Sequence, residues 1–420
     1  MSRAPLLPGF VLLAALAGSS PALAGARVAI SDDTWAQVGL LLQPQVRFDQ
    51  DGTYTKDGWA YTPFLRRARV LLSGQVTDRV YFFFETDSPN MGRSGDWTPM
   101  VFVQDAWVEY DVAPELQIDV GMLLLPFSRH GTQGATSLLM SDYHSALLKY
   151  PAGSHKIWRD SGVMARGRIA KQVEYRLALT NGVQSGYGAQ LQDTDEDGIP
   201  DTDPRGLLNP SDLPRVTGRL VYNVFDAEGG PGAAGYFYKG AGLKTDGKRV
   251  VTPKRVLSVG LSADWQADAF YAVDPHDLTD PLDDRWSTEA YLGLAADVYA
   301  DLPLEGGERA VNAQAAFYRY DHGDASVLVD SARGAIQPMS GMGGFVEGGY
   351  RIGTWEPLLC AEMYDVSDAE ASDYLAILGG LAWWYQGHAA NVKAEIGASR
   401  AGGSESDFSL AGTLQTQLLF

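Results

Sequence analysis

Six arginines occur as three pairs, and the two members of each pair are separated by an even number of positions. In a β-strand, residues at such a spacing point to the same face. A guanidinium group is permanently charged and can hold a phosphate or carboxylate through two donors. The pattern predicts three strands that present anion-guiding cations to one polar surface, namely Arg67, Arg69, Arg166, Arg168, Arg215 and Arg219.

Carboxylates fall on the same phase of the surrounding alternating segments. Arginine and carboxylate groups on neighbouring strands can pair with each other, and the interior of a large barrel is polar and mixed in charge simply because water fills it. A specific anion site and a mixed polar lining therefore both stay open. The carboxylates concerned are Glu85, Asp87, Asp105, Glu109, Asp119, Glu174, Asp297, Glu362 and Glu395.

Residues 193–204 read DTDEDGIPDTDP and predict a calcium site. Closely spaced carboxylates suit a hard cation such as Ca²⁺, and Gly198 permits the sharp turn that such loops need. Pro204 occupies the place of the bidentate glutamate of an EF-hand, and the segment resembles the aspartate-rich calcium repeats of thrombospondin type 3. The alternative is a solvated acidic loop. The expected ligands are Asp193, Asp195, Asp197, Asp201 and Asp203.

A third set of reactive residues lies in one long connection, residues 128–160. It holds histidines together with serines and an aspartate, which are the residue types of a nucleophile, a base and an orienting group. No barrel-enzyme motif surrounds them, so an outer-membrane phospholipase or protease is kept only as an alternative. These residues are Ser128, His130, Ser137, Asp142, His144 and His155.

The elements that position these residues are strands. The stretch from Asp105 to Phe127 is two alternating runs joined by residues 113–115, which leaves room only for a hairpin. The second run has apolar residues on one face and Gln117, Asp119, Gly121 and Leu123 on the other. Runs of about ten residues with one apolar face are typical of transmembrane β-barrels. A β-sandwich could share one such hairpin, but the pattern continues to the end of the chain.

Sixteen such runs are expected, because single-chain bacterial barrels have an even number of strands. The segment from Tyr236 to Gly242 would be a seventeenth, and the alternation of short and long connections excludes it as a full crossing. Region 226–255 fits this scheme least well. The runs are residues 35–48, 64–77, 80–87, 101–112, 116–127, 161–170, 173–180, 215–225, 256–266, 288–300, 311–320, 344–352, 357–365, 374–385, 391–398 and 408–420.

The two ends of the chain indicate export to an outer membrane. Residues 1–24 have a positive start at Arg3, a short apolar run and an A-x-A site, which predicts a signal peptide cleaved after Ala24. The rest of the chain contains no apolar stretch long enough for a transmembrane helix. The last run is amphipathic and ends at Phe420. It resembles the C-terminal aromatic signature read by the barrel-assembly machinery of Gram-negative outer membranes.

Composition supports one large all-β unit, residues 25–420, and excludes general nucleic-acid binding. After cleavage the net charge is 32 − 52 = −20, whereas a nucleic-acid-binding chain is expected to carry a basic footprint. The single cysteine, Cys360, lies in an alternating run and is expected to pack as a small residue. Aromatic residues near strand ends would form the girdles at the two membrane interfaces.

Three segments resemble a known family. They are FLRRAR at residues 64–69 with GQV at 74–76 and FFETD at 83–87, DAWVEY at 105–110 with VGM at 120–122 and PFS at 126–128, and GYFYKG at 235–240. In this order they resemble the phosphate-selective porin O/P family. The resemblance implies a sixteen-stranded barrel, a homotrimer, and a loop folded into the pore to form a constriction. Residues 128–160 are the candidate for that loop.

These observations predict an outer-membrane porin for passive diffusion of small hydrophilic solutes, with anions such as phosphate among them. Its partners would be outer-membrane lipid and, during biogenesis, the barrel-assembly machinery. The alternatives are a non-conducting barrel that acts as an adhesin or structural protein through calcium-ordered loops, a barrel enzyme, and a soluble periplasmic β-protein. The terminal strand argues against the last of these.

Overall fold

The computed structural model describes residues 26–31, 34–50, 58–95, 97–98, 100–113, 115–149, 158–170, 172–183, 209, 212–228, 244–245, 248–249, 254–273, 286–323, 328–330, 334–336, 340–367, 373–403 and 406–420. The signal peptide, the calcium motif at 193–204, the segment 236–242 and His155 lie outside the described residues.

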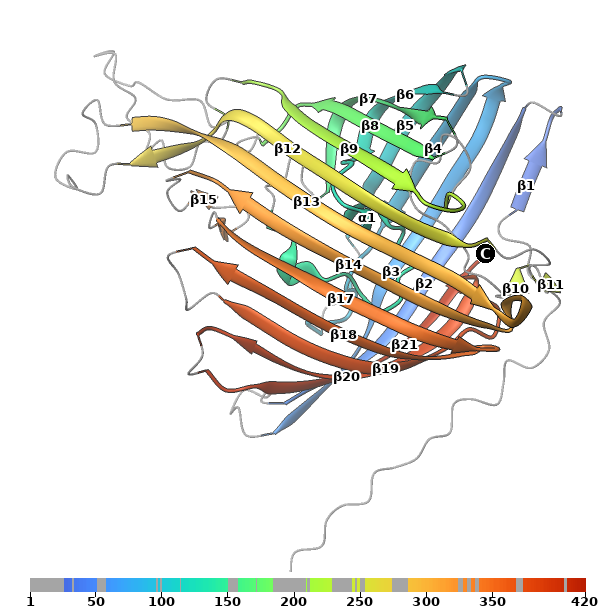
Figure 1. Cartoon of the computed structure of the whole chain (residues 1–420), viewed down its shortest axis with the longest axis vertical. Helices are drawn as coiled ribbons and strands as arrows, with labels where there is room; N and C mark the ends of the chain where they lie inside the picture. Colours follow the sequence, from blue (N-terminus) through green and yellow to red (C-terminus); the bar gives the residue numbers. More distant parts are fainter. Residues whose placement is uncertain are drawn as a thin grey trace, which may run out of the picture.

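Sixteen antiparallel strands form a closed barrel (Figure 1). Each strand pairs with the next along the chain, and β2 closes the ring by pairing with β21. The strands are β2 (Trp35–Gln50), β3 (Trp59–Thr77), β4 (Val80–Asp87), β5 (Phe102–Ala113), β6 (Leu116–Leu124), β7 (Arg159–Ile169), β8 (Val173–Thr180), β9 (Arg215–Asn223), β12 (Val256–Val273), β13 (Trp286–Leu304), β14 (Arg309–Asp321), β17 (Gly341–Ile352), β18 (Trp355–Val366), β19 (Tyr374–Trp383), β20 (Ala390–Ala401) and β21 (Ser409–Leu419).

The predicted strand count is confirmed. Strand β9 pairs directly with β12, from Val216 opposite Trp265 to Asn223 opposite Ser258. No strand lies between them in the barrel wall, so the region 226–255 adds no crossing. The additional strand β1 (Ala26–Ala29) pairs only with the first residues of β2 and extends the sheet beside the barrel wall.

Several smaller elements are not part of the barrel wall. Two short hairpins are formed by β10 (Lys244–Thr245) with β11 (Lys248–Arg249) and by β15 (Leu328–Asp330) with β16 (Gly334–Ile336). A short helix α1 (Arg129–Thr132) and a 3-10 turn at Ser145–Leu147 belong to the connection after β6, and a second 3-10 turn lies at Glu305–Gly307. Among the described residues, no helix has both the length and the apolar character needed to cross a bilayer.

The two faces of each strand differ as the alternation predicts. In β6, Val120 is 51% exposed on the outside, whereas Gln117 and Asp119 are buried on the inside. The same contrast holds in β9, where Leu220 and Tyr222 are exposed beside the buried Arg219. Apolar side chains on the outside of a closed barrel suit lipid contact, and polar ones on the inside suit water.

The largest apolar cluster lies inside the barrel instead of between layers. It forms where the chain turns inward after β6 and packs against β13, β14 and β17. The ring of Phe127 lies 6.2 Å from that of Tyr318 and 5.9 Å from that of Tyr320. This contact fixes the start of the inward-turning segment on the far side of the lumen.

Candidate functional site: the lumen and the inward loop

Each of the six predicted arginines makes an ion pair with a carboxylate on the inner face. The partners come from neighbouring strands, from the next strand but one, or from the connection after β6. The pairs are Arg67 with Asp142 at 2.6 Å, Arg69 with Glu85 at 2.8 Å, Arg166 with Asp119 at 2.6 Å, Arg168 with Glu174 at 2.6 Å, Arg215 with Asp264 at 2.8 Å and Arg219 with Asp297 at 2.6 Å.

Four of these pairs have both side chains buried, and two of the four, Arg215 with Asp264 and Arg219 with Asp297, share two hydrogen bonds. Arg215 and Asp264 have fully buried side chains and two hydrogen bonds between them, and Thr217 donates a third bond to Asp264 at 2.8 Å. Arg166 contacts Glu109 as well as Asp119. A buried charge is tolerated only when a partner and hydrogen bonds compensate its lost hydration. The lining is therefore a mixed-charge surface, as the second of the two sequence readings proposed.

One pair reaches across an intervening strand. Arg219 on β9 contacts Asp297 on β13, although β12 lies between them. Gly260 on β12 makes this possible, because a Cβ atom there would lie 2.4 Å from Nη2 of Arg219. The absent side chain leaves the space through which the guanidinium passes.

The connection after β6 folds into the barrel, and we call its described residues 125–149 the inward loop (Figure 1). Its contacts reach strands far around the wall. The Lys393 ammonium on β20 donates to the carbonyl oxygens of Leu138 and Met140 at 2.5 and 2.9 Å. The backbone amide and hydroxyl of Ser141 donate to Glu395 at 2.5 and 2.6 Å.

A second anchor fixes the first turn of the loop. The Arg129 guanidinium contacts Glu228 at 2.7 Å and also Gln314 on β14, and it lies 3.3 Å from the centre of the Tyr299 ring. The Arg129 amide donates to Asp297 at 3.1 Å. Ser128 caps α1 by accepting a hydrogen bond from the Gly131 amide at 3.0 Å.

The middle of the loop is held from the opposite wall. Asp142 contacts Arg66 and Arg67 of β3. Burial would raise the pKa of Asp142, but the two guanidinium groups outweigh burial and hold that pKa below its ordinary value. Asp142 is thus a stable counter-charge for the arginines of β3.

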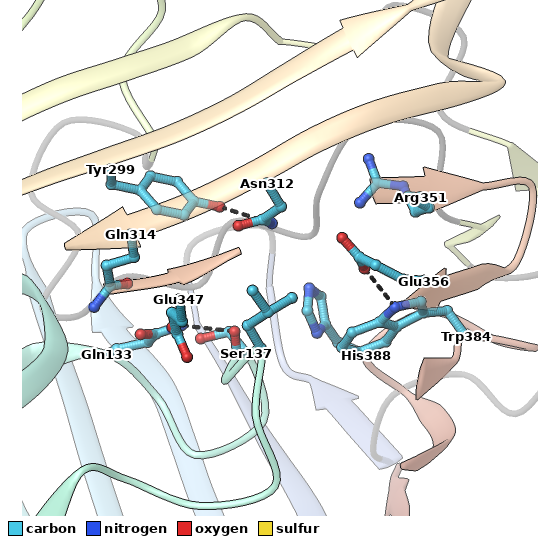
Figure 2. Close-up of a pocket in the computed structure, with 11 residues that line it drawn as sticks. Gln133, Ser137, Tyr299, Asn312, Gln314, Glu347, Arg351, Glu356, Trp384 and His388 are labelled. Carbon is cyan, nitrogen blue, oxygen red and sulfur yellow. Dashed lines mark hydrogen bonds between the residues drawn. The ribbon is translucent and has the colours of Figure 1, made fainter. Parts of the chain in front are cut away.

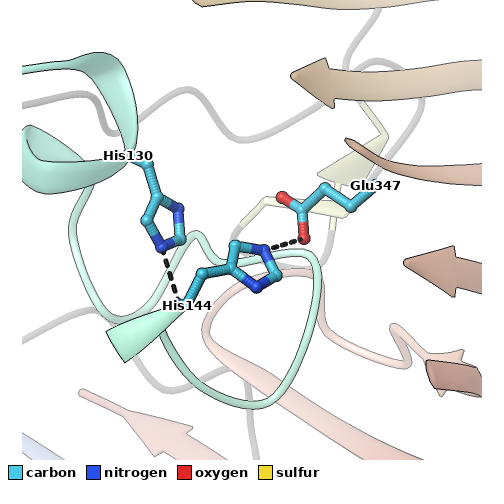
Figure 3. A group of neighbouring side chains, drawn as sticks. All are labelled: His130, His144 and Glu347. Atoms are coloured by element: carbon cyan, nitrogen blue, oxygen red, sulfur yellow. Dashed lines mark hydrogen bonds and ion pairs between the residues drawn. The ribbon is translucent and has the colours of Figure 1, made fainter. Parts of the chain in front are cut away.

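His144 is the centre of a cluster on the β17 and β18 side (Figure 3). Its Nδ1 lies 2.5 Å from Glu362 and its Nε2 lies 3.2 Å from Glu347. Burial favours the neutral ring, but hydrogen bonds with Cys360, Glu347 and Glu362 outweigh burial and raise the pKa of His144 well above its ordinary value. An imidazole with a carboxylate at each nitrogen is a doubly donating cation.

His130 completes this cluster. Its Nε2 accepts a hydrogen bond from the His144 backbone amide at 2.9 Å. Burial, followed by the neighbouring His144 and Arg129 charges, lowers the pKa of His130 well below its ordinary value. The ligand-type atoms of His130, His144 and Glu347 lie within 4.8 Å of one another. Metal binding would require His144 to lose its proton, and its two carboxylate partners favour ion pairing instead.

The serines and the aspartate of the enzyme alternative have other partners. Ser128 caps α1 and accepts from the Tyr318 hydroxyl at 3.1 Å, and the Ser137 hydroxyl donates to the Gly134 carbonyl at 2.9 Å. Asp142 is held by arginines and His144 by glutamates. These contacts give the residues roles in holding the loop in place.

The inward loop divides the lumen unequally. One cavity between the loop and β13, β14, β17 and β18 has a volume of about 10 Å³ (Figure 2), which is room for about one water. Figure 2 shows the side chains that line this cavity, with Gln133 bonded to Ser137 and Glu356 to Trp384. On the β2–β7 side it leaves a cavity of about 450 Å³, and a third cavity of about 190 Å³ lies beside β19–β21.

The wall of the 450 Å³ cavity beside β2–β7 includes residues that were not predicted as functional. Tyr81, Phe83 and Trp107 line it together with Arg69, Arg159 and Arg166 and their carboxylate partners. The alternation could have predicted that these three aromatic residues face the lumen. Tyr81 and Phe83 share the phase of Glu85, and Trp107 shares the phase of Asp105. The loop contacts of Glu347, by contrast, had no local sequence signal.

No family model matches the sequence, and no curated protein matches it. Solved structures of similar fold include outer-membrane porins and channels. Salmonella typhi OmpF in complex with daunomycin has a TM-score of 0.55 at 10% identity and covers 93% of this chain and 98% of its own. The outer membrane channel DcaP of Acinetobacter baumannii has a TM-score of 0.54 at 12% identity, with 95% and 100% covered.

The trimer form of the outer membrane protein OmpT of Vibrio cholerae has a TM-score of 0.51 at 9% identity, with 93% and 100% covered. At these identities the likeness concerns the fold. That fold is a closed sixteen-stranded antiparallel barrel, which this chain shares with outer-membrane proteins of Gram-negative bacteria. The finer resemblance to the phosphate-selective O/P family stays a prediction from the quoted segments.

Proposed function

We propose that this protein is an outer-membrane porin through which small hydrophilic solutes diffuse passively, and that it performs no catalysis. The observation that carries the proposal is the unequal division of the lumen by the inward loop. The cavity between the loop and β13, β14, β17 and β18 holds about 10 Å³, whereas the cavity between the loop and β2–β7 holds about 450 Å³. A narrowed, polar-walled space within a closed barrel is the arrangement of a size-limiting diffusion channel.

The charge arrangement supports a pore without strong anion preference. The six candidate anion-guiding arginines each have a carboxylate counter-charge within the lumen. A permeating phosphate would have to compete with these carboxylates for the same donors. We therefore do not extend the phosphate selectivity implied by the family resemblance to this chain.

We further propose a homotrimer in the membrane. The support is the fold shared with an outer membrane protein that was solved in a trimer form. Residues 193–204 are proposed to bind Ca²⁺ and thereby order the connection at 181–214, on the strength of their aspartate spacing.

The decisive experiment measures ion current through the purified protein in a planar bilayer under a KCl gradient, with phosphate then added. Stepwise conductance with a small reversal potential that is indifferent to phosphate is expected. Anion-selective current that is blocked by a low phosphate concentration would support phosphate selectivity. An absence of current would overturn the porin and favour the adhesin alternative.

A further inference from the structure

An aromatic row lines the barrel wall at the 450 Å³ cavity beside β2–β7. We call Tyr81, Phe83 and Trp107 the aromatic shelf. The Trp107 ring centre lies 5.7 Å from that of Tyr81 and 5.6 Å from that of Phe83. Trp35, 6.3 Å from Tyr81, continues the row beside the short turn at residues 78–79. The row therefore runs along the wall from that rim of the barrel into the lumen.

These rings are on the inner face, away from lipid. Tyr81 and Phe83 alternate with outward residues and share the phase of Glu85, which is buried within the lumen. All three shelf residues remain partly exposed. Trp107 also packs against an apolar cluster of inner-face residues, Leu123, Met164 and Ala178. The inner wall thus holds an apolar surface that neither lipid nor complete burial explains.

Ion pairs surround the shelf and leave the cavity without net charge. Its described lining contains three arginines and three acidic residues, which gives a formal charge of 3 − 3 = 0. The pairs are Arg69 with Glu85 at 2.8 Å, Arg159 with Asp105 at 3.0 Å, and Arg166 with Glu109. Paired groups still offer lone pairs and N–H groups to a ligand. The cavity therefore combines flat apolar faces with fixed donors and acceptors.

The inward loop closes the cavity opposite the shelf. Residues from Thr132 to Thr136 and the ring of Tyr143 form this second wall. The volume of about 450 Å³ lies within the range of about 300–1,000 Å³ found for small-molecule sites. A solute passing on this side of the loop must therefore move between the shelf and the loop.

We propose that this cavity is a binding subsite for neutral, hydroxylated ring solutes, namely mono- and oligosaccharides. A sugar ring has an apolar C–H face that can lie on the aromatic shelf, and hydroxyl groups that can bond the carboxylates and guanidinium groups beside it. A charged solute gains less here, because each fixed charge already has a partner. The inference rests on the proposed porin function and names its substrate class.

The test is calorimetric titration of the purified full-length protein with maltotriose, and with sorbitol as an acyclic polyol that lacks a ring face. Maltotriose is expected to bind and sorbitol is not. Trp107→Ala should weaken maltotriose binding by about tenfold or more, since aromatic contacts contribute roughly that much. Tyr110→Ala removes an outward-facing aromatic residue of the same strand and should leave binding unchanged.

Two further measurements keep the outcomes distinct. If Trp107→Ala does not fold, Tyr81→Leu tests the same shelf while retaining an apolar side chain. Conductance in KCl without sugar is measured on the same preparation. Conductance with no maltotriose binding, or with equal binding of sorbitol, overturns the subsite alone. Maltotriose binding without conductance supports the subsite and overturns the porin function.

Discussion

The Nδ1 atom of His144 lies 2.5 Å from the carboxylate of Glu362, although 218 positions separate the two residues in the chain. The contact joins the inward loop to β18, nearly opposite the strands from which the loop departs. Together with Glu347 at 3.2 Å, Glu362 holds a protonated imidazole in the lumen. The position of the loop therefore depends on charge as well as on packing.

We predict that the loop loosens at alkaline pH. The pKa of His144 is raised above 6.5 in the folded protein, so its protonation stabilises the docked loop fully below about pH 6.5 and this contribution is lost as the pH rises through the raised pKa. The facing groups are Glu347, Glu362, Cys360 and His130. Open-channel current noise should increase on the alkaline side.

Glu362→Gln is the matched variant for this pH effect. It removes one carboxylate partner and should move the onset of the noise toward neutral pH. The same onset in the variant and the wild type would show that His144 does not set the position of the loop.

Lys393→Met should release the middle of the inward loop from β20. The ammonium group donates to two loop carbonyls, and hydrogen bonds to charged groups contribute about 1.5–3 kcal/mol each. We expect a larger and less steady single-channel conductance. Lys149→Met, in the same loop, provides a control that leaves the Lys393 anchor in place. Equal conductance in wild type and Lys393→Met would contradict an anchoring role.

The double variant Glu85→Gln and Glu109→Gln should make the pore prefer anions. Each change keeps the side-chain shape and removes a carboxylate from an arginine pair. The formal charge of the described cavity lining therefore changes from 0 to +2. The reversal potential in a KCl gradient should shift toward chloride. Glu305→Gln, in an exposed pair at the barrel end, should cause no shift. An unchanged reversal potential in the double variant would place the permeation path elsewhere.

Asp264→Ala should destabilise the barrel strongly. It removes the carboxylate partner of Arg215 in a fully buried pair, and breaking such a pair costs about 3–5 kcal/mol. The effect is measured by urea unfolding in detergent, with the loss of heat-modifiable gel mobility as the readout. Glu305 forms an exposed ion pair with Arg309. Removal of the Glu305 carboxylate should lower the free energy of unfolding by at most about 1 kcal/mol. A similar loss of unfolding free energy in the Asp264 and Glu305 variants would argue against a buried charge pair between Arg215 and Asp264.

Calcium binding at residues 193–204 is expected to depend on the aspartate spacing. Titration with Ca²⁺ should show a site that Asp195→Asn with Asp197→Asn abolishes. Asn substitutions in the acidic cluster at Asp274 and Asp277, which lacks that spacing, should leave binding intact. Loss of binding in both variants would indicate general acidity instead of a defined loop.

The sequence by itself determined the barrel and the direction of its side chains. Alternation of period two in sixteen segments fixed the strands, and it placed Arg166 and Asp119 inside and Val120 outside. It did so because neighbouring residues of a strand point to opposite faces, a local property that needs no knowledge of distant segments. The same phase could have identified Trp107 as a lumen residue.

Only the tertiary structure decided which inward charges meet. Arg219 reaches Asp297 across β12 because Gly260 leaves room, and Asp142 meets Arg67 because the inward loop returns to β3. These contacts depend on register, barrel closure and the path of a long connection. Such features join residues far apart in the chain, so local periodicity could propose arginine guides but could not show that each had a carboxylate partner.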